Sequence, residues 1–248
     1  MTAQQQYSLI KKLYTSVSRE VLLDVPALQR IGISNQRAAS YAKSGWLVRV
    51  AHGLYTFPQT EPSLGAAVAH VSGQIPGLHL GGRSAIGDNS CDDHEPLVLW
   101  GDVRAVLPRW FAERYPVRYV HARLFDAGAS TSILKATLEI DRRYPGFVRS
   151  TRERALLEML YEVGCSHTLR MAQHVFYEVG AVCPQATGEL LQRCTSVKAV
   201  RLYLRLARQA QLFNVDELLE RCCIRASSGR RWVSRLKDGT TLCLGPYG

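Results

Sequence analysis

Along residues 25–57 the spacing of the hydrophobic residues changes from that of helices to that of strands. In the first part, apolar residues recur every three positions: Val25, Leu28 and Ile31. This spacing predicts a short helix with one inward face. Gly32 can end that helix, because a glycine takes the left-handed conformation without steric cost. Ser34 follows as a helix cap whose hydroxyl accepts hydrogen bonds from backbone N–H groups, and the second helix is expected to run to about Ser44.

Two stretches rich in β-branched and aromatic residues come next, at 46–50 and 54–57, joined by the loop 51–53. They predict a β-hairpin. Helix, turn, helix and hairpin in this order are typical of a winged helix-turn-helix, whose second helix enters the DNA major groove. A further helix beginning at residues 7–14 would complete a three-helix core, so the winged helix-turn-helix is expected to span residues 1–60.

The polar side chains of this predicted module are of the kinds that recognise DNA. Arginine pairs with guanine, and asparagine or glutamine with adenine. The predicted DNA-binding residues are Ser34, Asn35, Gln36, Arg37, Ser40, Lys43, Arg49 and His52. Among them, Gln36 and Arg37 are expected to contact bases, and Arg49 and His52 to contact phosphate or the minor groove.

Charge favours DNA over the alternative, a winged helix that only docks another protein. Residues 1–60 carry seven Lys or Arg and two Asp or Glu, a net charge of +5. A cationic module suits phosphate binding. Residues 61–150 balance ten basic against ten acidic residues, whereas residues 151–248 carry fourteen basic and nine acidic residues.

Residues 61–248 predict a larger α/β domain, so the fold class is α+β. Short strands are expected at 77–80, 96–100, 117–121, 135–140 and 147–148, which indicates one mixed or antiparallel sheet. A short helix is expected at 65–71, before these strands. Beyond Ser150 the chain is expected to be helical, with helices predicted from 150 and near 167–180, 186–195, 197–211 and 215–222. Ser150 and Glu153 have the spacing of a capping box. Asp238-Gly239 predicts a hairpin turn between strands near 231–236 and 240–244.

Two features of this larger domain could bind anions. Gly81-Gly82 precedes a predicted helix start and could cradle an anion there, although tight packing of strand on helix is the better explanation. Cationic residues spaced by three and four share one face of the 197–211 helix: Lys198, Arg201, Arg205 and Arg208. They are a possible basic surface for a partner or phosphate, or simply a solvated face.

The seven cysteines contain no Cys-x-x-Cys pair, which argues against a zinc knuckle. We expect reduced thiols, mostly buried as small hydrophobic residues. No apolar run approaches the roughly 20 residues that span a bilayer, and residues 1–6 lack the apolar core of a signal peptide. The expectation is a cytoplasmic protein without a membrane partner and without a metal or other cofactor.

Two other function classes remain open. A winged helix fused to a nuclease would need clustered carboxylates to hold a metal; the candidates are Asp126, Glu139 and Asp141, with a second acidic run at Asp92, Asp93, His94 and Glu95. The first set lacks a lysine two residues after Glu139. A repressor whose residues 66–248 sense a small ligand is the other alternative.

Several segments together resemble the AbiEi antitoxins of AbiE-type, or type IV, bacterial toxin–antitoxin systems. They are Gly45-Trp-Leu-Val-Arg-Val, Gly53-Leu-Tyr, Leu78-His-Leu-Gly-Gly-Arg-Ser-Ala, Ser150-Thr-Arg-Glu-Arg-Ala-Leu-Leu-Glu158 and Ser196-Val-Lys-Ala-Val-Arg-Leu202. Their order and spacing cover nearly the whole chain. Ser34 to Lys43 match the family's recognition helix and Arg49 to His52 its wing. Ser40 stands where the family often has a basic residue, and the acidic stretch 87–94 departs from the apolar continuation expected there.

The resemblance implies a protein of two parts that is not an enzyme and has no catalytic residues. The winged helix would bind repeats in double-stranded promoter DNA and repress its own operon. The C-terminal part would counteract a cognate nucleotidyltransferase-like toxin. Such systems are implied to act in phage defence.

Overall fold

The structure is a computed structural model that describes residues 3–86, 96–126, 136–142, 147–222, 224, 231–235, 239 and 241–245. The chain forms two compact units. Unit 1 comprises Met1–Gln74, Leu107–Tyr115 and Arg142–Phe147, and unit 2 comprises Ile75–Val106, Pro116–Asp141 and Val148–Gly248. The architecture is mixed α/β with helices and several sheets, as the sequence predicts.

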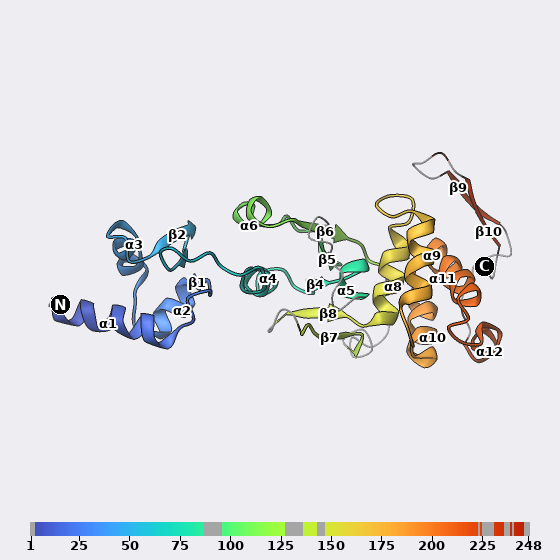
Figure 1. Ribbon diagram of the computed structural model, residues 1–248, viewed down its shortest axis with the longest axis horizontal. Coiled ribbons are helices and arrows are strands. Elements are labelled where there is room, and N and C mark those ends of the chain that lie inside the picture. Colours follow the sequence, from blue (N-terminus) through green and yellow to red (C-terminus); the bar gives the residue numbers. More distant parts are fainter. Residues whose placement is uncertain are drawn as a thin grey trace. The chain divides into compact units, whose positions relative to one another are not determined.

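Unit 1 begins with three helices and three short strands (Figure 1). The elements are α1 (Ala3–Ser16), β1 (Leu23–Asp24), α2 (Val25–Arg30), α3 (Asn35–Lys43), β2 (Val48–Ala51) and β3 (Leu54–Thr56). The three strands form an antiparallel sheet in the order β1-β3-β2. Buried apolar residues form the core here, among them Leu28, which the sequence spacing placed inward, and Ile33, Ala38 and Tyr41.

Unit 1 also contains α4 (Leu64–Ser72) and α6 (Arg109–Arg114). The Tyr115 hydroxyl, directly after α6, donates a hydrogen bond to the Pro62 carbonyl at 2.5 Å. The rings of His70 in α4 and Trp110 in α6 lie 6.1 Å apart. These contacts join two segments that are distant in the sequence.

The main sheet of unit 2 has five strands in the order β6-β5-β4-β8-β7. They are β4 (His79–Leu80), β5 (Leu97–Gly101), β6 (Val117–His121), β7 (Leu138–Ile140) and β8 (Val148–Ser150), with the short helix α5 (Arg83–Ile86) between β4 and β5. β5 runs parallel to β6, and β4 parallel to β8, whereas the β4–β5 and β7–β8 pairs are antiparallel. The sheet is therefore mixed, one of the two arrangements that the sequence predicts.

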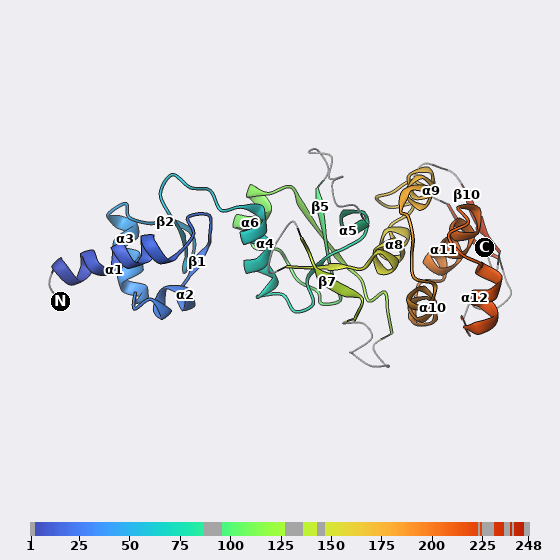
Figure 2. The ribbon, with the colours of Figure 1, turned by 60° about the horizontal axis from the view of Figure 1, so that its bottom comes forward.

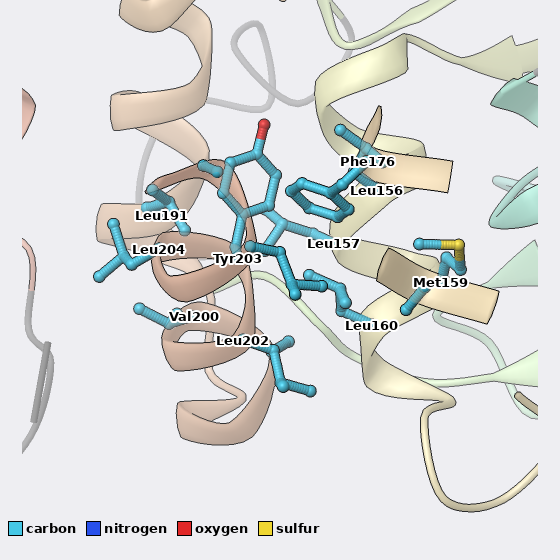
Figure 3. Close-up of a cluster of buried hydrophobic side chains, with 14 of the residues drawn as sticks. Leu156, Leu157, Met159, Leu160, Phe176, Leu191, Val200, Leu202, Tyr203 and Leu204 are labelled. Carbon is cyan, nitrogen blue, oxygen red and sulfur yellow. The ribbon is translucent and has the colours of Figure 1, made fainter. Parts of the chain in front are cut away.

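Helices follow the sheet. They are α8 (Arg152–Tyr161), α9 (Leu169–Glu178), α10 (Pro184–Arg193), α11 (Val197–Gln209) and α12 (Val215–Arg221). In Figures 1 and 2, α8 lies between the sheet and the other helices. Figure 3 shows why: leucines of α8 pack against Phe176 of α9, Leu191 of α10 and Tyr203 of α11. An antiparallel hairpin of β9 (Trp232–Arg235) and β10 (Thr241–Leu244) comes last.

One local prediction is wrong, and another falls partly outside the described residues. The capping box is wrong: Thr151 is the N-cap residue of α8, and Ser150 and Glu153 bond elsewhere, to Glu158 and to the Cys183 N–H. Of the predicted Asp238-Gly239 turn, Asp238 lies outside the described residues, and Gly239 has the left-handed φ of +84° that such a turn requires.

The expectation of mostly buried cysteines is also wrong. Among the described residues, Cys165, Cys183 and Cys243 are exposed, whereas Cys194 and Cys222 are half-buried. Burial raises the pKa of the Cys194 thiol to about 12. Within the described ranges, no helix combines the length and the apolar character needed to cross a membrane.

Candidate nucleic-acid interface

The starts of α2 and α3 are fixed by their capping residues. The Asp24 carboxylate accepts from the Ala27 N–H at 2.8 Å and so caps α2. Gly32 then takes a left-handed φ of +91°. The Ser34 hydroxyl accepts from the Arg37 N–H at 3.3 Å, as predicted for the cap of α3. These local bonds place α3 independently of any ligand.

The two faces of α3 differ sharply. Ala38 and Tyr41 face the core of unit 1 and are buried. The exposed residues of the helix are Asn35, Gln36, Ser40 and Lys43, with the cap Ser34 exposed beside them. This outward polar row contains five of the eight predicted DNA-binding residues.

Arg37 is half-buried and differs from its neighbours on the helix. Its Nη1 donates to the Gly32 carbonyl at 3.4 Å, across the turn between α2 and α3. A guanidinium has five N–H donors. In this conformation the side chain folds back along the turn, so a base contact requires Arg37 to extend.

The β2–β3 hairpin holds Arg49 and His52 together. The Arg49 Nη2 lies 2.9 Å from His52 Nδ1, and the Arg49 Nε donates to the Ala51 carbonyl at 3.3 Å. Because a guanidinium can only donate, His52 Nδ1 accepts and the imidazole proton sits on Nε2. Both side chains are exposed, and the turn is made possible by Gly53 at a φ of +70°.

Asn35 and His52 line a groove of about 490 Å³ in unit 1. Its other polar and aromatic lining includes Asp24, His70, Gln74 and Trp110. Burial lowers the pKa of His70, and the Asp24 carboxylate opposes that shift. The sequence analysis missed His70, Gln74 and Trp110 as groove residues, because no local sequence pattern connects the α4 and α6 segments with the hairpin.

The four cations of α11 do not form one open face, which corrects the expectation of a basic surface there. Arg201 is 1% exposed, and its Nη1 donates to the Leu244 carbonyl of β10 at 2.9 Å. Lys198 Nζ donates to the carbonyls of Tyr161 and Val163 at 2.6 and 2.9 Å, and burial lowers its pKa. Arg208 pairs with Asp216 of α12 at 2.6 Å, and Arg205 is half-buried. Other elements thus cover Arg201 and engage Lys198, whereas Arg208 stays exposed.

The carboxylates considered for a nuclease have other surroundings. Glu139 is paired with Arg149 at 2.8 Å, Asp141 is fully buried, and Asp126 is exposed. In the part of the chain that the structure describes, no group of three or more His, Cys, Asp or Glu has a metal-holding arrangement. The acidic run Asp92–Glu95 lies outside that part.

A charged cluster around Glu158 is the strongest polar feature that the sequence analysis missed. This fully buried carboxylate accepts from His79 Nε2 and Arg154 Nε at one oxygen, at 2.9 and 2.8 Å. Its other oxygen accepts from the Gly82 N–H at 2.9 Å and the Ser150 hydroxyl at 2.8 Å. Burial alone would raise the pKa of Glu158, but the cations of His79 and Arg154 lower it to about 2.

The same cluster explains Gly81-Gly82. A Cβ on Gly81 would lie 2.4 Å from the Glu158 Oε2 and 2.6 Å from the Trp100 ring. The glycines therefore allow close packing, and the anion that the Gly82 N–H binds is the chain's own carboxylate. Tight packing, the preferred explanation from the sequence, fits these distances.

Comparison with known proteins agrees with this architecture. Residues 6–91 match the N-terminal domain of the transcriptional regulator AbiEi antitoxin, and residues 94–242 match the transcriptional regulator AbiEi antitoxin of type IV TA systems. The crystal structure of the RV2827C protein from Mycobacterium tuberculosis is similar in fold, with a TM-score of 0.58 at 16% identity over 92% of this chain and 87% of that chain. The sequence matches no curated protein. From its two family matches, which together span nearly all of the sequence, the chain belongs to the AbiEi antitoxin family of transcriptional regulators of type IV toxin–antitoxin systems.

Proposed function

We propose that residues 1–60 are a winged helix-turn-helix that binds double-stranded DNA upstream of the chain's own gene and represses it. The observation that carries this proposal is the outward polar row on α3, whose members Asn35, Gln36, Ser40 and Lys43 are exposed while the opposite face is buried. In this module α3 is the recognition helix and β2–β3 is the wing.

Charge supports the same assignment. Residues 1–60 carry a net charge of +5, and phosphate contacts by cations supply the sequence-independent part of DNA affinity. Arg49 and His52 on the hairpin supply phosphate or minor-groove contacts, whereas Gln36 and Arg37 contact base edges.

The remainder of the chain, residues 61–248, acts as the antitoxin part. It counteracts a cognate nucleotidyltransferase-like toxin, as its membership of a type IV antitoxin family suggests. The family is described as a regulator, which supports a protein that controls transcription and breaks no bonds itself.

The direct test is a gel-shift titration of the full chain against duplex DNA from upstream of its own gene. A shuffled duplex of equal length serves as the control, and both are measured at two salt concentrations. We expect the upstream DNA to bind at least a thousandfold more tightly than the shuffled duplex, with both affinities falling as salt rises. Equal affinity for the two duplexes at both salt concentrations would refute sequence-specific binding.

A further inference from the structure

Unit 2 encloses a cavity of about 230 Å³ at the edge of its main sheet. Its apolar wall is formed by Trp100, Leu124, Phe125 and Leu138. Ligand sites in proteins are concave and mostly apolar, with a few polar groups that fix orientation. The volume is below the range typical of drug-sized ligands, so the cavity suits a smaller molecule.

Two exposed side chains of opposite charge, Asp102 and Arg123, also line this cavity. Their proximity follows from the sheet register. β5 and β6 are parallel, and Gly101 pairs with His121. Asp102 and Arg123 therefore follow the carboxyl ends of neighbouring strands, whose backbones lie about 4.8 Å apart in a sheet.

The backbone at both charges is held in place. The Asp102 carbonyl accepts from His121 Nε2 at 3.3 Å, and a Cβ on Gly77 would lie 3.3 Å from the Asp102 Oδ1. The Arg123 carbonyl accepts from the Thr195 hydroxyl at 3.0 Å. The backbone that carries the two charged side chains is thus held beside the apolar wall.

The buried charges at the back of the cavity are already satisfied by the protein. Glu158 accepts two hydrogen bonds at each oxygen. His79 donates from Nδ1 to the Gly77 carbonyl and from Nε2 to Glu158. Arg154, which also lines the cavity, donates from Nε to Glu158 and from Nη1 to the Thr137 hydroxyl. Asp102 and Arg123 are the exposed charged residues of the lining, and we take them as the partners of a charged ligand.

We propose that this cavity binds a free amino acid with an apolar side chain. The ligand's carboxylate pairs with Arg123, its ammonium group with Asp102, and its side chain packs against Trp100, Leu124, Phe125 and Leu138. An opposite pair of charges beside an apolar wall matches a zwitterion better than an ion of one sign. Such a site goes beyond DNA binding and toxin antagonism and gives unit 2 a small-molecule partner.

Isothermal titration calorimetry of the full chain with L-leucine and L-phenylalanine tests the proposal. We expect saturable binding of at least one of them at millimolar concentration. Relative to L-leucine, 4-methylpentanoate lacks the ammonium group and 3-methylbutylamine lacks the carboxylate. If leucine binds, both compounds should bind at least tenfold more weakly than leucine. If phenylalanine alone binds, the same comparison uses 3-phenylpropanoate, which lacks the ammonium group, and 2-phenylethylamine, which lacks the carboxylate.

Variants of the two charged residues sharpen the test. Asp102→Asn and Arg123→Met should each weaken binding of the amino acid at least tenfold. Arg104→Met is the control and should leave the affinity unchanged, because Arg104 is exposed near Asp102 but does not line the cavity. Circular dichroism confirms that each variant is folded. Absence of binding of both amino acids to the wild type at 10 mM, or unchanged affinity in either charge variant, overturns the proposal.

Discussion

At the scale of single residues, Glu158 is the group on which the interior of unit 2 depends most. It is fully buried, and its carboxylate joins β4 through His79, α5 through the Gly82 N–H and the end of β8 through Ser150. Such a charge is tolerated in the interior because it is paired and fully hydrogen-bonded. Removing its charge leaves His79 and Arg154 without their anion.

Glu158→Gln should therefore lower the free energy of unfolding by about 3–5 kcal/mol, the usual cost of breaking a buried ion pair. Urea denaturation measures this value. Glu178→Gln is the matched control, because Glu178 is 65% exposed and pairs with His174 at the surface; it should change the free energy by less than about 1 kcal/mol. Equal effects of the two changes would contradict the role given to Glu158.

The same carboxylate predicts how acid affects stability. The pKa of Glu158 is about 2 in the folded chain against an ordinary 4.5. A carboxyl whose pKa is depressed by folding stabilises the fold fully above its unfolded pKa. This contribution should be complete above about pH 4.5 and should disappear as pH falls toward 2. The acid-induced loss should be smaller in Glu158→Gln, which urea melts across this pH range can measure.

A separate prediction concerns the contribution of Lys43 to DNA affinity and its salt dependence. It is exposed in the last turn of α3, and we expect it to contact phosphate. Lys43→Ala should weaken binding to operator and to random DNA by a similar factor and reduce the slope of log affinity against log salt by about 1. Arg170→Ala, at an exposed arginine of unit 2, is the control and should leave the slope unchanged.

Local sequence rules predict some residue roles and miss others. The caps by Asp24 and Ser34 lie within a few residues of their partners, and the Ser34 cap was predictable for that reason. Glu158 bonds to groups 76 and 79 residues away. No local sequence pattern predicts such contacts. The Ser150 hydroxyl, which the sequence analysis expected to cap α8, bonds to Glu158 instead.

At the scale of elements, α11 shows how tertiary packing changes the meaning of a pattern. Helical spacing places Lys198, Arg201, Arg205 and Arg208 on one face. Part of that face lies against other elements: Arg201 is buried at β10, and Lys198 donates to carbonyls at and just after the end of α8, whereas Arg208 stays exposed. These cations hold elements together.

Arg201→Met should therefore lower the free energy of unfolding by about 1–3 kcal/mol, because the Leu244 carbonyl loses its donor. Arg208→Met should cost less than about 1 kcal/mol, since Arg208 and Asp216 form an exposed pair. Thermal denaturation compares them, and DNA affinity should stay unchanged in both variants. A larger effect of Arg208→Met than of Arg201→Met would contradict the structural role given to buried Arg201.

Periodicity located most elements of the described chain to within a few residues. The strand predicted at 117–121 is β6 (Val117–His121), and the helix predicted at 197–211 is α11 (Val197–Gln209). The strand order β6-β5-β4-β8-β7 could not be read in the same way. The pairing of β4 with β8 joins residues far apart in the chain. The apolar pattern of a strand does not depend on which strand lies next to it, so it cannot predict the strand order.

At the scale of the whole molecule, we propose that DNA binding and toxin antagonism belong to different parts of the chain. Unit 1 holds α3 and the hairpin, and unit 2 holds the main sheet and helices α8 to α12. If the parts act separately, surface changes on α3 should affect one activity alone.

The full chain carrying Arg37→Ala and Lys43→Ala should lose repression of a reporter fused to its own promoter. It should still rescue growth of cells that express the cognate toxin. Both activities are measured in the same strain, with protein amounts matched by immunoblot. Loss of rescue in a variant that is folded and equally abundant would show that the two functions share α3.

The central claim is that α3 reads bases in a DNA groove. A fluorescence anisotropy titration tests it by comparing wild type with Arg37→Ala on labelled upstream DNA and on a shuffled duplex. We predict that the variant loses about 10- to 100-fold in affinity for the upstream DNA, and much less for the shuffled duplex, because base contacts specify whereas phosphate contacts position. An equal loss on both duplexes would contradict the claim.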